Sequence, residues 1–216
     1  MQKLIERLKH MDTDWDIEFH ENDAYALASL VERSTSPRPV VIELGSWKGC
    51  SSAIIARVLK PRGGQLWCVD TWKGSADVPH HEQAKYRNIF YVFDANMQES
   101  GLADVVHPVM SLTQVAAGMF RDGSADLIFI DADHRYSSVK ADIAAYLPKL
   151  RAGGILCGHD WDWDFNEPLL PLELDKPEYL EVDTVPYHGG HLHAGVIKAV
   201  IEANGSPIKG SSIWMM

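Results

Sequence analysis

The sequence predicts an α/β protein built on a doubly wound, mostly parallel sheet with helices on both faces. Short runs rich in Val, Ile and Leu alternate with segments of helical spacing along most of the chain. The runs are apolar throughout rather than at every second residue, as in parallel strands that are buried on both faces. Four of the runs carry an acidic residue at or near their end, which predicts a ligand-binding edge of the sheet.

The individual elements follow from this alternation in chain order. Residues 1–38 form a helical lead-in, with apolar residues at helical spacing in 2–10 and 23–32, that ends at a Ser-Pro-Arg-Pro stop signal. The expected strands are residues 40–44, 65–70, 105–110, 125–131, 153–160 and 211–216. The expected helices are residues 51–59, 81–99, 113–120, 137–147 and 195–204. Residues 161–193 break the pattern, and we expect them to be a lid or substrate loop inserted into a single domain spanning 1–216.

Length, charge and cysteine content narrow the class of protein. The 216 residues suffice for one substantial α/β domain. A net charge of −10 gives no electrostatic footprint for nucleic acid or an anionic membrane, and no apolar run approaches the length of a transmembrane helix. Cys50, Cys68 and Cys157 lie in or beside apolar strands and are expected to be buried thiols of a reducing compartment, so a cytoplasmic location without a signal peptide is expected. The amphipathic N-terminal helices can pack either on the domain itself or on a second subunit, so a homo-oligomer is one of two alternatives.

Residues 40–52 are the most informative segment, because a strand runs there into a glycine-bearing turn and then into a helix. The residues expected at the ligand are Glu43, Gly45, Ser46, Gly49 and Ser51. Glycines let the backbone approach a ligand, and the N–H groups of the following helix attract an anionic group. The acid at Glu43 disfavours a phosphate and suits a ligand with a cationic amine, such as the amino-acid part of S-adenosylmethionine (SAM). The glycine spacing differs from the dinucleotide fingerprint GxGxxG, and a plain strand-to-helix turn is the alternative.

Three further cofactor-binding positions are expected at the ends of the second, third and fourth strands. Asp70 ends the second strand, where a carboxylate accepts the hydroxyls of a ribose in nucleoside-binding sheets. Its alternative role is to cap the segment that follows. Ser111, after the third strand, is placed beside the adenine by topology alone, and Asp131 ends the fourth strand.

A divalent-metal site is expected where the fourth and fifth strands end side by side, because Asp131 then meets the His159–Asp160 pair. Two carboxylates and a third donor leave open positions for substrate oxygens, a set that suits Mg²⁺ best and also admits Mn²⁺, Fe²⁺ or Zn²⁺. Such an ion lowers the pKa of a substrate hydroxyl. The alternative is that Asp160 caps the insertion and His159 packs in the core.

His134 is the candidate general base, and it acts together with Asp131 as the expected catalytic pair. It lies three residues after Asp131 at the entry to a helix, facing the same cleft. A histidine of near-neutral pKa suits the removal of a proton from a hydroxyl that is about to be methylated; a solvent-exposed helix-start histidine is the alternative. His188, His191 and His193 lack a fourth ligand for a tight zinc site, so we expect a loop that ends in a helix cap; the alternative is that one of these histidines reaches the active site.

Taken together, these residues resemble the class I SAM-dependent methyltransferases, whose fold is a Rossmann-like seven-stranded sheet. Glu43-x-Gly45-x-x-x-Gly49 is similar to their first motif, Asp70 to their ribose-binding acid and Ser111 to the residue beside adenine. The segments IDADH, GHD and GVIKAV recur in the same order in a branch of small bacterial methyltransferases. Relatives of that branch include the macrolide-sugar O-methyltransferases and, more distantly, the catechol and caffeoyl-CoA O-methyltransferases.

The resemblance implies methyl transfer from SAM to a hydroxyl of a small molecule, a sugar or a phenolic natural product. It implies that Asp131, His159 and Asp160 occupy the divalent-metal positions and that His134 is the general base. His159 stands where those relatives carry an acid, which changes the ligand set. Two other functions stay open: a catalytically silent SAM-binding or interaction protein, and a nicotinamide-dependent oxidoreductase, against which the missing GxGxxG and the acid at Glu43 count.

Overall fold

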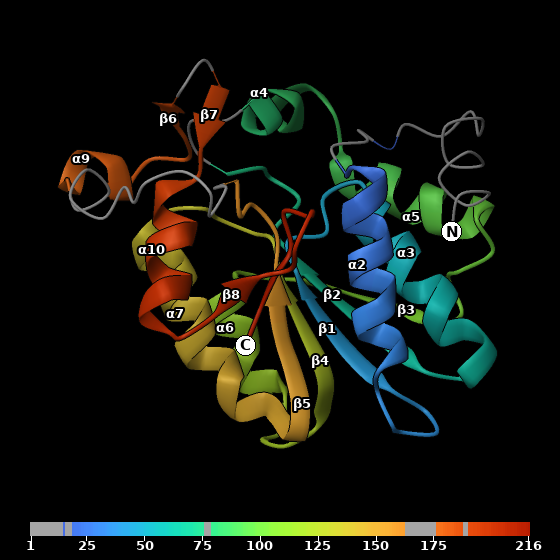
Figure 1. Cartoon of the computed structure of the whole chain (residues 1–216). Helices are drawn as coiled ribbons and strands as arrows, with labels where there is room; N and C mark the ends of the chain where they lie inside the picture. Colours follow the sequence, from blue (N-terminus) through green and yellow to red (C-terminus); the bar gives the residue numbers. More distant parts are fainter. Residues whose placement is uncertain (1–14, 16–18, 76–78, 163–175, 188–189) are drawn as a thin grey trace.

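The protein folds around one seven-stranded sheet in the order β3-β2-β1-β4-β5-β9-β8 (Figure 1). The computed structural model describes residues 15, 19–75, 79–162, 176–187 and 190–216. The strands of this sheet are β1 (Val40–Leu44), β2 (Gln65–Asp70), β3 (Val106–Met110), β4 (Ala125–Ile130), β5 (Leu150–Gly158), β8 (Ser206–Pro207) and β9 (Trp214–Met215). β1 to β5 pair in parallel, whereas β9 is antiparallel to both β5 and β8. The predicted mostly parallel, seven-stranded sheet is thereby confirmed.

Helices cover both faces of the sheet, as Figure 1 shows. One face carries α2 (Glu21–Glu32), α3 (Cys50–Leu59) and α5 (Ile89–Glu99). The other carries α6 (Thr113–Ala116), α7 (Tyr136–Tyr146) and α10 (Ala194–Glu202). Short 3-10 turns at Lys60–Arg62, Ala117–Met119 and Leu147–Lys149 follow α3, α6 and α7. This arrangement is the doubly wound one that the apolar strands predict.

Two hydrophobic cores result, because successive side chains of a strand point to opposite faces. Val41 belongs to the core under α2, α3 and α5, and its neighbour Ile42 belongs to the core under α6, α7 and α10. Both side chains are fully buried. The alternation also decides where Glu43 points: it shares the face of Val41 and lies beneath the N-terminal end of α3.

A third group of elements lies beyond the carboxyl ends of the parallel strands, at the top of Figure 1. It consists of α4 (Pro79–Tyr86), α9 (Pro177–Leu180) and the two-stranded hairpin of β6 (Val185–Tyr187) and β7 (Gly190–Leu192). α9 and the hairpin are the described part of the insertion expected at 161–193. Among the described residues, no helix is both long and apolar enough to cross a bilayer.

Two predicted elements differ from the structure. The helix expected over 81–99 is two helices, α4 and α5, because the chain leaves helical geometry at Asn88, whose side chain caps α5 by accepting the N–H of Tyr91. The closing strand is shorter than expected and covers Trp214–Met215. The two-residue strand β8 precedes it and was not predicted, because its sequence contains no hydrophobic run. The helix expected at 2–10 lies outside the described residues.

Candidate active site

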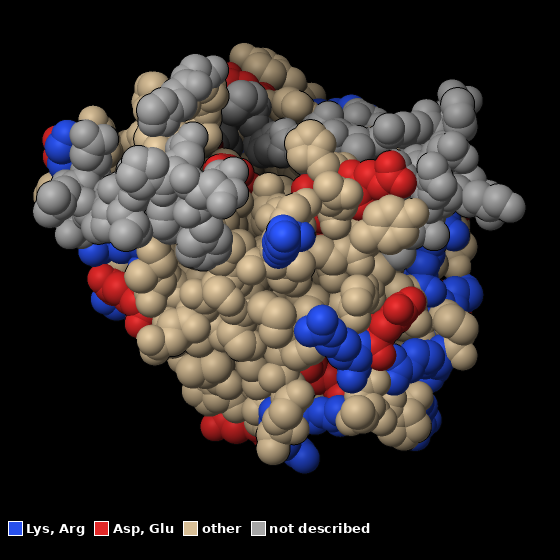
Figure 2. All heavy atoms as spheres, in the orientation of Figure 1, with Lys and Arg blue, Asp and Glu red and all other residues tan. Residues whose placement is uncertain are grey.

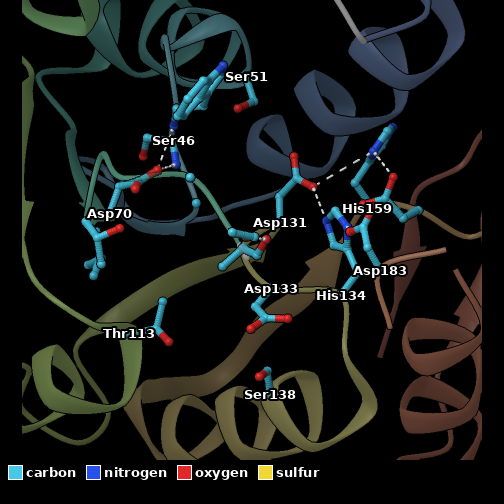
Figure 3. Close-up of a pocket in the computed structure, with 18 of the residues that line it drawn as sticks. Ser46, Ser51, Asp70, Thr113, Asp131, Asp133, His134, Ser138, His159 and Asp183 are labelled. Atoms are coloured by element: carbon cyan, nitrogen blue, oxygen red, sulfur yellow. Dashed lines mark hydrogen bonds and ion pairs between the residues drawn. The ribbon is translucent and has the colours of Figure 1, made fainter. Parts of the chain in front are cut away.

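A cavity of about 790 Å³ opens at the carboxyl ends of the parallel strands. Its size is in the range of small-molecule sites. The sequence-predicted residues that line it are Gly45, Ser46, Gly49, Ser51, Asp70, Ser111, Asp131, His134, His159 and Asp160. Of the predicted site residues, Glu43 alone does not line it. Figure 3 shows Asp131 in the middle of the site. Ser46 and Asp70 lie on one side of it, and His134 and His159 lie on the other.

The turn after β1 is held in a conformation that only glycine tolerates at Gly45. Its φ of +83° is left-handed, and a Cβ there would lie 2.0 Å from the carbonyl oxygen of Asp131. Gly49 has a φ of +93° and caps α3 without a side-chain hydrogen bond. The turn therefore passes close to the end of β4, and the N-terminus of α3 points its backbone N–H groups toward the cavity edge.

Glu43 supports this turn from below instead of facing the ligand. Its carboxylate is fully buried and accepts hydrogen bonds from the hydroxyls of Ser46, Ser51 and Ser52. Burial raises its pKa, while the three hydroxyls partly offset this effect. Glu43 therefore does not face the cavity, where we expected it to contact a cationic amine. Alternation along β1 turns its side chain into the core between β1 and α3.

Asp70 organises the same turn through the backbone. Its Oδ2 accepts the N–H groups of Ser46 (2.9 Å) and Trp47 (2.8 Å), and its Oδ1 accepts that of Trp72 (2.6 Å). A carboxylate has about four acceptor directions, and the backbone of Thr71 also interacts with this one, so the described conformation uses most of them within the turn. Ser111 lines the cavity after β3, and its N–H donates to the carbonyl of Asp70. Both stay predicted cofactor contacts.

On the other side of Asp131, a cluster of carboxylates and imidazoles crosses the rim of the sheet (Figure 3). His134 is at its centre: Nε2 lies 3.0 Å from Oδ2 of Asp160 and 3.9 Å from Oδ1 of Asp131. Its Nδ1 lies 2.7 Å from Oδ1 of Asp183. Asp160 adopts a left-handed φ of +68°, rare for a residue with a side chain, and such conformations cluster at functional sites.

The donor atoms of Asp131, His134 and Asp160 fit a divalent cation. They lie within 4.8 Å of one another. Around an ion with ligands at about 2.1 Å, adjacent ligand atoms are about 3.0 Å apart and opposite ones about 4.2 Å apart, and the two distances from Nε2 of His134 lie in this interval. That nitrogen is buried, makes no hydrogen bond of good geometry and faces both carboxylates, as expected for ligands that share one ion.

His159, the predicted metal ligand, is engaged elsewhere. Its ring stacks on Phe19 at 4.6 Å, Nδ1 lies 2.9 Å from Oδ1 of Asp160, and Nε2 faces Oδ2 of Asp23 at 3.6 Å. Among the described residues, the donor group that contains both Asp131 and Asp160 has His134 as its third member, not His159. The structure thus brings the predicted base to the position expected for the ligand.

The charges of the cluster do not favour a neutral His134. Burial lowers its pKa, but the carboxylates of Asp160, Asp131 and Asp183 outweigh burial and raise the pKa well above its usual range. Burial likewise raises the pKa of Asp160, yet the neighbouring His134 and His159 hold it well below its usual range. A general base and a metal ligand both need a neutral imidazole, so these charges do not separate the two roles, and the ligand role of His134 rests on its distances to Asp131 and Asp160.

Several cavity or rim residues were missed by the sequence reasoning, among them Asp162 and Asp183. Asp183 precedes the β6–β7 hairpin, and Oδ2 of Asp162 lies 2.5 Å from Nδ1 of His193. Trp15 lines the cavity, and Asp23 lies behind His159. Asp23 had a readable signal, since it shares the buried face of α2 with Leu27; the others lie in segments without periodicity. Of the three histidines 188–193, His193 reaches the cavity, His191 is exposed in β7, and His188 lies outside the described residues.

A doubly wound sheet with a ligand cavity at the carboxyl ends of its strands defines a nucleotide- or nucleoside-binding α/β protein. Comparison with known proteins narrows this class. The family described as "Methyltransferase domain" matches residues 42–161. The chain therefore belongs to the methyltransferase-domain family, and the predicted resemblance to the methyltransferases is confirmed.

The individual proteins to which the chain is similar have low sequence identity to it. The chain is 25% identical over 122 residues to the uncharacterized protein y4gI of Sinorhizobium fredii; this match covers 56% of the chain, which spans only 13% of that protein. The O-methyltransferase TomG from Streptomyces achromogenes, involved in tomaymycin synthesis and solved with SAM, has a TM-score of 0.61 at 18% identity, over 97% of this chain and 83% of TomG. The O-methyltransferase from Bacillus cereus solved with S-adenosylhomocysteine (SAH) has a TM-score of 0.57 at 16% identity, over 99% and 86% of the two chains. These likenesses show a shared fold.

Proposed function

We propose that the protein transfers a methyl group from SAM to a hydroxyl of a small, uncharged molecule, with a divalent cation at the acceptor side. The observation that carries the proposal is the position of Asp131. It lies between the turn and strand ends expected to hold SAM and a donor set that fits a cation. A methyl donor and an activated oxygen must meet in line in one cavity, and this arrangement puts their expected sites on either side of one residue.

The SAM half of the proposal rests on the family and on the residues around the turn. Gly45, Ser46, Gly49 and Ser51 are expected to bind the amino-acid part, with the N-terminus of α3 toward its carboxylate. Asp70 and Ser111 are expected at the ribose and the adenine. TomG and the Bacillus cereus enzyme, which share the fold, were solved with SAM and SAH respectively.

The cation half rests on Asp131, His134 and Asp160. When bound there, a divalent ion lowers the pKa of an acceptor hydroxyl and fixes its oxygen. Mg²⁺ or Mn²⁺ suits two carboxylates and an imidazole with open positions. In this proposal His134 is a ligand in the loaded protein, which revises its predicted role as the general base. The described part of the 161–193 insertion contributes Asp183 and His193 to the acceptor side.

An uncharged acceptor follows from the charges around the cavity. The lining includes the carboxylates of Asp131, Asp160, Asp162 and Asp183. Lys48 and Arg135 are the Lys and Arg residues of the described lining, and Arg135 is paired with Asp133. On the face in Figure 2, Lys and Arg gather mostly at the lower right, with Asp and Glu beside them. Carboxylates therefore outnumber Lys and Arg in the described lining, and the histidines beside them already face these carboxylates. A sugar or a neutral phenol, which needs no cationic partner, suits the site better than a phosphorylated or carboxylated acceptor.

Calorimetric titration of SAM and SAH into metal-stripped protein, repeated with Mg²⁺ and Mn²⁺, tests both halves. We expect micromolar binding of both nucleosides and a separate heat for the ion that is lost in Asp131→Asn. Asp133→Asn is the matched control, because it removes a cavity carboxylate outside the donor set and should keep the ion heat.

Each outcome has a distinct meaning. Protein that binds neither nucleoside contradicts the methyltransferase proposal. Nucleoside binding without an ion heat contradicts the cation half alone. If both bind but no sugar or phenol is methylated, the protein is a catalytically silent SAM-binding protein.

A further inference from the structure

An alternating chain of acids and histidines crosses the rim of the sheet and begins outside the matched family region. It runs Asp23, His159, Asp160, His134, Asp183, with closest N–O distances of 3.6, 2.9, 3.0 and 2.7 Å in that order. Asp23 belongs to α2, whereas the family match starts at residue 42. The first acid of the chain therefore comes from the N-terminal lead-in.

The ring and the backbone of His159 are both constrained by contacts with neighbouring residues. Phe19 stacks on its ring with an interplanar angle of 19°. Its backbone N–H donates to the carbonyl of Ile130, and its carbonyl accepts the indole N–H of Trp214. Nδ1 is directed at Oδ1 of Asp160, the oxygen of that carboxylate opposite to the one that faces His134.

Asp23 is positioned to hold the far nitrogen of the His159 ring. It is 1% exposed, and its Oδ1 accepts the N–H of Ser212 at 2.7 Å. Oδ2 of Asp23 and Nε2 of His159 are both buried without a hydrogen-bond partner, and they face each other across 3.6 Å. Two orphaned, complementary atoms at this separation form a bond after a shift of less than about 1 Å.

We propose that Asp23 and His159 are a positioning pair that orients the carboxylate of Asp160 toward the cation site. The inference rests on the proposed cation site. Residues behind a metal ligand fix its orientation, and their loss costs about 10- to 100-fold in metal affinity. Asp160 needs such support because its left-handed backbone is intrinsically unfavourable. The competing arrangement, His159 as a direct ligand, has some geometric basis, since its Nδ1 lies 4.0 Å from Oδ1 of Asp131.

The test is Mn²⁺ affinity of the full chain, with SAH affinity and thermal unfolding measured on the same samples. Asp23→Asn should weaken Mn²⁺ binding about 10- to 100-fold and leave SAH affinity within about twofold. Asp126→Asn is the matched control: it removes a buried carboxylate that holds Ser34 and the N–H of Val40 near the other end of the sheet. It should lower stability without changing Mn²⁺ affinity.

Pulsed EPR of the Mn²⁺-loaded protein separates positioning from ligation. We expect the signal of one coordinated imidazole nitrogen, kept in His159→Gln and lost in His134→Gln. A signal lost in His159→Gln, or Mn²⁺ affinity unchanged in Asp23→Asn, overturns the inference while leaving the cation site intact. Wild-type protein that binds SAH but no Mn²⁺ overturns the cation site and the positioning pair together.

Discussion

At the scale of single residues, the positions that the backbone constrains most tightly were the most readable in the sequence. Gly45 and Gly49 were expected at a close backbone approach, and both have left-handed φ angles at the cavity. Side-chain roles were harder to read. Glu43 lies beneath the turn, and His134 instead of His159 shares a possible donor set with Asp131 and Asp160, because β1 alternation and the packing of α2 decide these orientations and neither is encoded in the local motif.

Gly45→Ala tests how far the turn depends on its glycine. We expect a loss of more than about 3 kcal/mol in unfolding free energy, because a left-handed conformation costs about 1–2 kcal/mol and the new Cβ would in addition lie 2.0 Å from the carbonyl oxygen of Asp131. Gly123→Ala is the control for φ alone, since Gly123 has a φ of +68° and the Cβ that the substitution adds would meet no atom within 4 Å. Urea unfolding measures both; equal losses in the two variants would show that the close approach is unimportant.

At the scale of elements, α6 and α7 are joined through one buried acid that no motif indicated. Asp142 of α7 is 1% exposed and accepts hydrogen bonds from Thr113 (2.6 Å) and Gln114 (2.8 Å) of α6. Tyr146 adds a bond from its hydroxyl to the carbonyl of Thr113. Burial raises the pKa of Asp142 to about 6. Helical spacing predicted both helices, but a polar contact between them depends on their mutual placement and is not visible in either pattern.

This acid makes stability depend on pH in a defined direction. The pKa of Asp142 in the folded state, about 6, exceeds the usual 3.8, so the folded state binds the proton more tightly than the unfolded state. This difference stabilises the fold fully below about pH 4, and the stabilisation is lost as the pH rises through about 6. Asp142→Asn has no proton to lose. Between about pH 4.5 and 8 the stability of the variant should therefore improve relative to wild type by about 2 kcal/mol. Urea unfolding of both proteins at the two pH values measures the difference; parallel curves would contradict the burial effect.

At the scale of the whole molecule, the fold class was predictable and the completed site was not. Near-continuous apolar strands between amphipathic helices suffice for a doubly wound sheet, and the acids at strand ends marked the correct edge. Asp23, Asp162, Asp183 and His193 reach that edge from α2 and from the insertion. Their arrival depends on how segments far apart in sequence pack over the sheet, which a reading of local patterns does not supply.

The packing of α2 predicts that the lead-in and the matched region 42–161 unfold as one unit. Leu27 is fully buried in the core that α2 shares with α3, Val41 and Phe129. Leu27→Ala should cost about 2–5 kcal/mol and shift the whole transition, seen identically by far-ultraviolet circular dichroism and by tryptophan fluorescence. Ser29→Ala, at an exposed position of the same helix, should change stability by less than about 0.5 kcal/mol. A first transition confined to the lead-in would show that α2 is an accessory layer, and the proposed support of the cation site by Asp23 would then be lost before the sheet unfolds.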